Sequence, residues 1–262
     1  MRRKHGVPLW TVCASLAAGP LLAGCGWVGG GLAERSGPEV SEQAGEALRS
    51  AESLRVRISL DGGTDSATEV DLTLDDEGNC RGTVAQAGEG SAELVRRGNE
   101  VWLRPDEAFW KSRAGAAGEN SYALFRGRYL HGSVDDPVLG GLSGTCDLAG
   151  LRESSAETGG DWGAPRTGTL DGVRVVSVTR REKHGSTTLH VAREGTPYPV
   201  RVDKSGAEES GTMRFSDFGT PVPTRVPSAA ESVDVDELRR NRARGTGAEA
   251  APGADTGPGP AG

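Results

Sequence analysis

Apolar and polar residues alternate one by one along much of the chain, and this period of two constrains the fold more than any other feature. The pattern begins in residues 54–60, LRVRISL, where leucine, valine and isoleucine alternate with arginine and serine. Side chains of a β-strand point alternately to its two faces, so such a segment predicts a strand with one apolar and one polar face. Turn sequences such as Asp61-Gly62-Gly63 separate the segments. The first part of the chain therefore predicts an antiparallel meander, with strands at 54–60, 70–74, 80–86, 91–96 and 101–104.

The second part of the chain predicts more strands, and three segments predict helices. Further strands are expected at 166–170, 173–180, 187–192, 198–203 and 212–215, with 233–238 as a candidate edge strand. Residues 40–54 carry apolar side chains at helical spacing, and helical regions are also expected at 119–130 and, less regularly, at 138–151. Three helical segments must then cover the shared apolar face of about ten strands. The fold class is α+β, and a curved antiparallel sheet wrapped around a few helices is one solution, while a well-packed sandwich is the other.

The first residues of the chain have the layout of a bacterial lipoprotein signal peptide. Arg2, Arg3 and Lys4 form a basic head, and a mostly apolar stretch with two prolines follows. This stretch has the length of a signal-peptide core. It ends in Leu22-Ala23-Gly24-Cys25, which resembles the lipobox. We therefore expect cleavage after residue 24 and lipid on the thiol of Cys25, with the alternatives of an uncleaved anchor or a secreted protein in which this cysteine is incidental.

The charge of the expected mature chain bears on its partners. The whole chain has 30 Lys and Arg and 37 Asp and Glu. Removing residues 1–24 takes away three of the basic residues and none of the acidic ones, which leaves a formal charge of −10. An acidic chain is a poor partner for nucleic acid or for an anionic bilayer surface. We expect no nucleic acid partner, and we expect the membrane to be reached through the lipid on Cys25.

Cys80 and Cys146 are the cysteines left when Cys13 goes with the signal peptide and Cys25 carries lipid. An even pair in an exported domain predicts a disulfide. Closing so long a loop stabilises the fold by about 4 kcal/mol in the chain-entropy account. A zinc site is the poorer reading, because these two cysteines are 66 positions apart and have no histidine at ligand spacing.

The sequence offers no motif for catalysis or for a cofactor. Residues 141–145, GLSGT, lack the closing glycine of a nucleophile elbow, and residues 88–93, GEGSAE, lack the last glycine of a dinucleotide-binding loop. His131, His184 and His190 are the histidines of the expected mature chain. A joint site of His184 and His190 across a hairpin is the weaker reading, and isolated strand or turn histidines the stronger. We expect no enzyme activity, no metal and no cofactor.

Apolar side chains of the early strands are the candidates for a ligand cavity. Trp102, Phe109 and Trp110 could form an aromatic wall, or they could be ordinary core residues. If the sheet closes around an apolar interior, the inward-facing residues of the first five strands line it. These candidate cavity-lining residues are Val56, Ile58, Leu72, Leu74, Leu94, Val101 and Leu103.

Several segments together resemble the actinobacterial LppX/LprA/LprF/LprG lipoproteins. They are the lipobox with the helix after it, residues 54–60 (LRVRISL), 98–104 (GNEVWLR), 198–202 (YPVRV) and 215–222 (FSDFGTPV). The likeness covers residues 40–236. It lies in the order and the character of these segments more than in one invariant motif. It implies a half-barrel of antiparallel strands around helices, like the periplasmic LolA carriers, with a cavity for acyl chains. The Gly-rich insertions and the Cys80/Cys146 pair are departures from the family pattern, and they leave the size of the cavity open.

The sequence thus predicts a lipoprotein on the outer face of the cytoplasmic membrane that binds or carries an apolar ligand, an acyl lipid by the resemblance. The alternative is a non-enzymatic interaction or structural lipoprotein with a filled core. Four parts are expected: a signal peptide at 1–24, a lipidated tether at 25–38, a half-barrel domain at 39–238 and a disordered tail at 239–262, rich in glycine, alanine and proline.

Overall fold

A computed structural model describes residues 31–61, 67–115, 122–137, 139–155, 160–206 and 210–248. These residues belong to one compact unit that begins at Gly31. The expected signal peptide and Cys25 lie outside the described residues. Among the described residues, no helix has the length and apolar character needed to cross a membrane.

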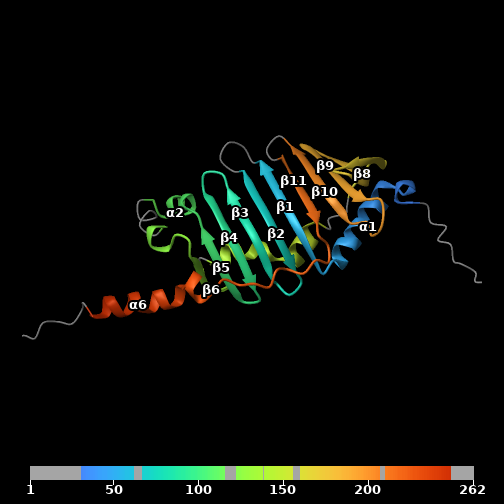
Figure 1. Cartoon of the computed structure of the whole chain (residues 1–262). Coiled ribbons are helices and arrows are strands. Elements are labelled where there is room, and N and C mark those ends of the chain that lie inside the picture. Colours follow the sequence, from blue (N-terminus) through green and yellow to red (C-terminus); the bar gives the residue numbers. More distant parts are fainter. Residues whose placement is uncertain are drawn as a thin grey trace, which may run out of the picture. The chain divides into compact units, whose positions relative to one another are not determined.

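The described strands form one twelve-stranded, open and curled sheet (Figure 1). Its order is β12-β6-β5-β4-β3-β2-β1-β11-β10-β9-β8-β7, so the meander β1–β6 and the meander β7–β11 meet where β1 pairs with β11. Every pairing is antiparallel except that of β12 with β6. The strands are β1 (Ser53–Asp61), β2 (Thr68–Asp75), β3 (Cys80–Gln86), β4 (Gly90–Arg97), β5 (Glu100–Pro105), β6 (Tyr129–Ser133), β7 (Arg166–Leu170), β8 (Val173–Glu182), β9 (Gly185–Ala192), β10 (Pro199–Gly206), β11 (Ser210–Ser216) and β12 (Ser232–Asp234).

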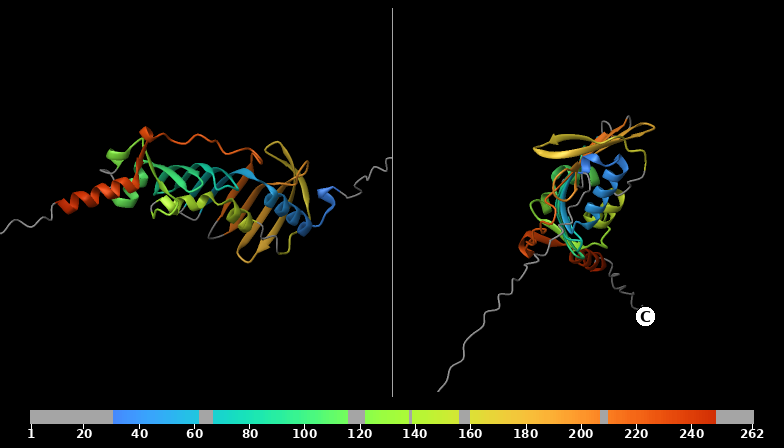
Figure 2. Two further views of the ribbon diagram at one scale, coloured as in Figure 1. Left: turned by 90° about the horizontal axis from the view of Figure 1, so that it is seen from below. Right: turned by 90° about the vertical axis from the view of Figure 1, so that its right-hand side faces the viewer.

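Two helical elements lie side by side against the inner face of the sheet. Helix α1 (Gly37–Ser50) lies within the curve of strands β8–β10, and the segment α4 (Leu139–Ser143), η2 (Gly144–Cys146) and α5 (Leu148–Ser155) runs along the other strands (Figure 2). The sheet with these helices is an α+β half-barrel, the fold class that the alternation and the helical segments predicted. The other helices are η1 (Leu32–Glu34), α2 (Glu107–Ala114), η3 (Ala229–Glu231) and α6 (Val235–Ala248).

Helix α1 begins at a complete capping box. The backbone N–H of Glu39 donates to the hydroxyl of Ser36, and the Glu39 carboxylate accepts from the backbone N–H of Ser36. Such a box satisfies backbone donors that the first turn of a helix leaves without partners. The local sequence therefore fixes where α1 starts, and hence which of its side chains face the sheet.

A disulfide joins the helical segment to the sheet. Cys80 starts β3 and Cys146 ends η2; their sulfur atoms are bonded, with Cα atoms 5.5 Å apart. Both cysteines are buried in the larger core cluster, together with Leu139 and Leu148 of the helical segment. Arg96 of β4 also donates to the carbonyl of Ser143, at 3.4 Å. The α4–η2–α5 segment is thus tied down over the β1–β5 half of the sheet.

Four sequence expectations differ from the structure. Of the helix expected at 119–130, residues 122–125 are helical in the described part, but residues 129–133 form β6, because they pair with β5. The candidate edge strand at 233–238 is β12 for two residues and then α6. The expected disordered tail from 239 starts as a helix, since α6 extends to Ala248 with an i,i+3 ion pair between Asp236 and Arg239. Of the expected tether, residues 32–34 form η1, and Leu32 packs against the core.

Candidate functional site

The inner face of the sheet consists of cross-strand rows, and burial decreases from one row to the next. The most buried rows lie under the α4–η2–α5 segment. The next row crosses eight strands, from β4 to β8, and its middle is only half-buried. Its members, in spatial order, are Ala92, Val84, Val70, Ile58, Met213, Val202, Leu189 and Val178. Apolar side chains on the concave face that remain half-exposed mark where the helices stop covering the sheet.

The seven predicted cavity residues all belong to this inner face, but six of them are in the packed core. Leu139, Cys146 and Leu148 of the helical segment cover them, and each is at most 2% exposed. The disulfide-linked segment fills the space over β1–β5. These six residues therefore pack a core and do not line an open cavity there. Ile58 alone of the seven is half-buried, in the row just described. The six packed residues are Val56, Leu72, Leu74, Leu94, Val101 and Leu103.

An apolar cleft lies instead between α1 and strands β9–β11. Its volume is about 350 Å³, at the lower end of the range of ligand-binding pockets. Met213 and Val202 are half-buried and belong to the row that contains Ile58, while Phe215 and Leu189 form more buried parts of its wall. The lining residues are Ser41, Ala44, Gly45, Leu48, Trp162, Arg180, Thr187, Leu189, Pro199, Val202, Lys204, Met213 and Phe215.

The small side chains of α1 explain why this cleft exists. Ser41, Ala44 and Gly45 are buried and face the cleft, so this stretch of the helix approaches the sheet without filling the space. On either side of the stretch, Val40 and Leu48 are fully buried in the two core clusters. The helix is therefore held at both ends by larger residues while its middle leaves a gap.

Trp102 and Trp110 do not share an aromatic wall, which was the alternative to ordinary core packing. Trp102 stacks on His131, with ring centroids 4.6 Å apart, and packs with Val95 and Tyr129 in a small cluster of its own. Trp110 stacks on Phe125 in a different part of the molecule. The aromatic residues of the cleft are Phe215 and Trp162, and sequence analysis missed Trp162. It lies after a Gly-rich loop, outside any strand pattern, and forms a single bridge to Arg180.

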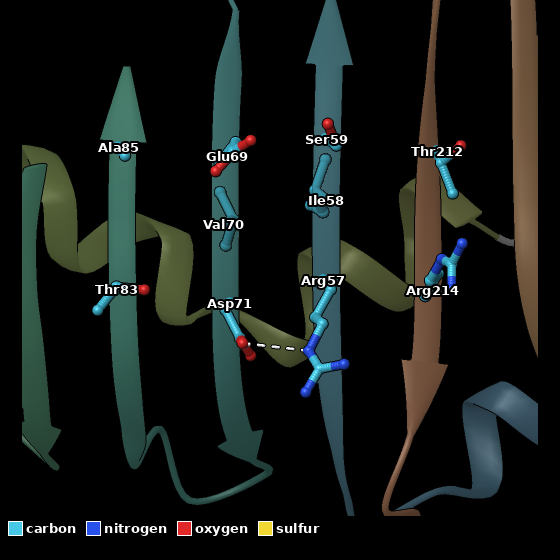
Figure 3. A pocket seen from close by; sticks show the side chains of 10 residues that line it. All are labelled: Arg57, Ile58, Ser59, Glu69, Val70, Asp71, Thr83, Ala85, Thr212 and Arg214. Carbon is cyan, nitrogen blue, oxygen red and sulfur yellow. Dashed lines mark hydrogen bonds and ion pairs between the residues drawn. The ribbon is translucent and has the colours of Figure 1, made fainter. Parts of the chain in front are cut away.

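A second hollow, of about 620 Å³, lies on the polar outer face of the sheet (Figure 3). Asp71 accepts two hydrogen bonds of 2.7 Å from Arg55 and one of 3.1 Å from Arg57. The hydrogen bond from Arg55 outweighs partial burial and holds the pKa of Asp71 below its usual range, with Arg57 adding to the effect. Ile58 and Val70 point to the other side of the sheet (Figure 3). Paired charges suit a solvated surface rather than an apolar ligand. The hollow is lined by Arg57, Ser59, Glu69, Asp71, Thr83, Ala85, Thr212 and Arg214, and it also borders Ile58 and Val70 on the strands between them.

Ser177, His190 and Asp203 form a hydrogen-bonded chain on neighbouring strands. The Ser177 hydroxyl lies 2.7 Å from Nδ1 of His190, and Nε2 of His190 lies 3.0 Å from the Asp203 carboxylate. Burial raises the pKa of Asp203, but hydrogen bonds from Arg201 and Thr212 outweigh it and keep this pKa below its usual range.

The Ser177–His190–Asp203 network has the residue types of a catalytic triad, but its surroundings differ from those of a catalytic site. It crosses β8, β9 and β10, interior strands whose backbone groups are used by the sheet on both sides. Backbone donors for an oxyanion are therefore taken. We interpret these three hydrogen-bonded side chains as a structural network. The described part of the protein also contains no group of three or more side chains placed to hold a metal ion, and His184 is exposed in the β8–β9 turn.

No family model matches the chain, and no curated protein sequence matches it. Among solved structures, the chain is similar to LprF from Mycobacterium bovis, with a TM-score of 0.49 and 14% sequence identity over 74% of this chain and 97% of that one. It is also similar to the lipoprotein LppX of Mycobacterium tuberculosis, with a TM-score of 0.46 and 14% identity over 72% and 97%. A LolA superfamily protein from Nitrosomonas europaea aligns over 72% and 96% with a TM-score of 0.27. LprF and LppX are two of the proteins that the sequence analysis named as similar to this chain.

Proposed function

We propose that this protein is a lipoprotein of the cell envelope that binds an acyl chain in the cleft between α1 and strands β9–β11. The observation that carries the proposal is the half-buried apolar row of the inner face, where Ile58, Met213 and Val202 continue the cleft across the sheet. Apolar side chains left partly open on a concave face lower the free energy of an apolar molecule that covers them, by about 0.8 kcal/mol for each buried methylene group.

The volume of the cleft limits the ligand. About 350 Å³ is small for a pocket that holds a whole drug-sized molecule. A single acyl chain, partly covered by α1 and partly lying along the half-buried row, fits this space better than a lipid with several buried chains. Binding requires no reaction, so the protein acts as a carrier or receptor and not as an enzyme.

The anchor places the cleft near its source of ligand. We propose that Cys25 carries the lipid after cleavage of residues 1–24 and that the protein stays on the outer face of the cytoplasmic membrane. Two or three acyl chains hold such a protein firmly, whereas one chain does so only marginally. Acyl chains can then exchange between bilayer and cleft, because both surroundings are apolar.

The second candidate function is a structural or interaction lipoprotein without a ligand. The packed core over β1–β5 favours it, because six residues that could line a cavity are closed off by the α4–η2–α5 segment. The two candidates differ in whether the cleft by α1 is occupied by lipid.

Native mass spectrometry of the full mature protein, extracted from the envelope in a mild detergent, tests this function. We expect a fraction of the protein to carry an additional mass that dissociates as an acyl lipid. A soluble Cys25→Ala form, purified without detergent and then exposed to lipid vesicles, is the control for the covalently attached chains. Protein without any additional lipid in both preparations would favour the structural role.

A further inference from the structure

One edge of the apolar cleft is cationic, and the register of the strands places it there. The row Val202, Leu189 and Val178 is followed, two residues further along β10, β9 and β8, by a polar row. In this second row, Lys204 pairs with Thr187, and Thr187 pairs with Arg180. Because side chains two residues apart on a strand share a face, both rows face the cleft. The cleft therefore changes from apolar to cationic over one step of about 7 Å along each strand.

The charges at this edge are already arranged around a carboxylate. Arg180 lies over the ring of Trp162, 5.1 Å from its centroid, and forms an ion pair of 3.1 Å with Glu182. Thr187 donates to the same Glu182 carboxylate at 2.9 Å. The hydrogen bond from Thr187 and that from Arg180 lower the pKa of Glu182, and the charge of Lys204 adds to the effect. Arg180 and Lys204 therefore both line this edge of the cleft, in a chain that is acidic as a whole.

We propose that the cleft binds single-chain amphiphiles with an anionic head group, a carboxylate or a phosphate, in preference to neutral ones. The head group lies between Arg180 and Lys204, and the acyl chain extends along Val202 and Met213. Glu182 is the internal counter-ion of the empty site, and the head group of the ligand takes its place. This inference rests on the proposed function, and it adds the chemical class of the head group.

The inference is tested with two probes of equal chain length, dodecanoate and dodecanol. Each displaces a fluorescent fatty alcohol from the full-length Cys25→Ala protein at neutral pH. We expect dodecanoate to bind about two- to fivefold more tightly than dodecanol, the size of a half-exposed charge pair. Raising the salt concentration should reduce this difference, because salt screens exposed charges.

Three variants assign the preference to the edge of the cleft. Lys204→Gln should weaken dodecanoate binding by about two- to fivefold and leave dodecanol binding unchanged. Glu182→Gln should strengthen dodecanoate binding, because the competing carboxylate is gone. Lys111→Gln removes the same charge on α2, which packs on β4 far along the sheet, and should change neither affinity.

The outcomes distinguish a failure of the anionic preference from a failure of the proposed function. Equal affinities for the two probes, unchanged in Lys204→Gln and Glu182→Gln, overturn the anionic preference and leave an acyl-chain site in place. An equal loss in Lys204→Gln and Lys111→Gln also overturns it, because the effect is then that of net charge. If neither probe displaces the fluorescent alcohol and the alcohol itself does not bind, the proposed function fails and the inference fails with it.

Discussion

Two substitutions that enlarge a valine to phenylalanine should have opposite effects in the two halves of the inner face. Val56 is 2% exposed and packed in the larger core cluster, whereas Val202 is half-buried and lines the cleft. Both residues are valines on the inner face of interior strands, so each is the control for the other. The pair distinguishes a packed core from an open cleft.

The structure gives the expected magnitudes. Val56→Phe must push against Leu72 and Phe215 beside it, and overpacking of this kind costs about 1–3 kcal/mol. For a domain of this size that lowers the melting temperature by roughly 2–12 °C. Val202→Phe has the cleft into which to extend, so its unfolding free energy should change by no more than about 0.5 kcal/mol. If the ring displaces two methylene groups of a bound chain, the loss is about 1.6 kcal/mol, or somewhat more than tenfold in Kd.

The assay combines a thermal melt with titration of a fluorescent fatty acid, on the parent protein and both variants. We expect Val56→Phe to melt earlier and to keep its affinity for the probe once folded, and Val202→Phe to melt near the parent and to bind weakly. The reasoning is refuted if Val202→Phe loses as much stability as Val56→Phe while the affinity for the probe does not change.

Three further predictions concern the anchor, the disulfide and the outer face. Cys25→Ser should release the protein from membrane fractions or stop its processing; normal cleavage with full membrane retention would contradict this. Cys80→Ala should lower the unfolding free energy by about 2–4 kcal/mol, and peptide mapping without reductant should join the Cys80 and Cys146 peptides; two free thiols in protein from the envelope would exclude the bridge. Asp71→Asn should cost about 0.5–1 kcal/mol near neutral pH, measured by urea unfolding. Because the folded pKa of Asp71 is lowered, its contribution is present above the unfolded value of about 3.9 and is lost as the pH falls through the folded value, so a cost that stays constant down to pH 2 would be inconsistent with it.

Local patterns in the sequence predicted the strands well because each strand has one face in water. Residues 54–60 and 70–74 fall within β1 and β2, and the strands expected at 173–180 and 187–192 fall within β8 and β9. In β1 and β2 the polar face is outside and the apolar face is inside, which is the condition under which alternation is visible. The helix expected over residues 40–54 starts earlier, at Gly37, because Ser36 and Glu39 form its capping box.

Where pairing with distant segments decides the structure, the sequence was a weaker guide. Residues 129–133 have an apolar start that fits a helix as well as a strand, and pairing with β5 makes them β6. Helix α2 was missed, although Asp106 accepts from the N–H of Phe109 as a helix cap does. A helix of eight residues has too few turns for a helical period to be recognised.

The position of the cleft could not be predicted from local pattern at all. It depends on β11 pairing with β1 and on α1 lying against β8–β10, contacts between segments more than 100 residues apart. Residues 56 and 202 look alike in the sequence, as valines in alternating strands. A signal was available in α1, because Ser41, Ala44 and Gly45 put small side chains on the face that turns to the sheet.

The most direct test of the central claim is photocrosslinking with a fatty acid that carries a diazirine near the end of its chain. The full-length protein is labelled in the envelope or with vesicles, digested, and the modified peptides are sequenced by mass spectrometry. We predict that the label is found on the peptides that line the cleft, from α1 and from β10 and β11 around Met213, and that an excess of unlabelled fatty acid prevents it. Labelling that is confined to other surfaces, or that unlabelled fatty acid does not reduce, would contradict an acyl-chain site in the cleft.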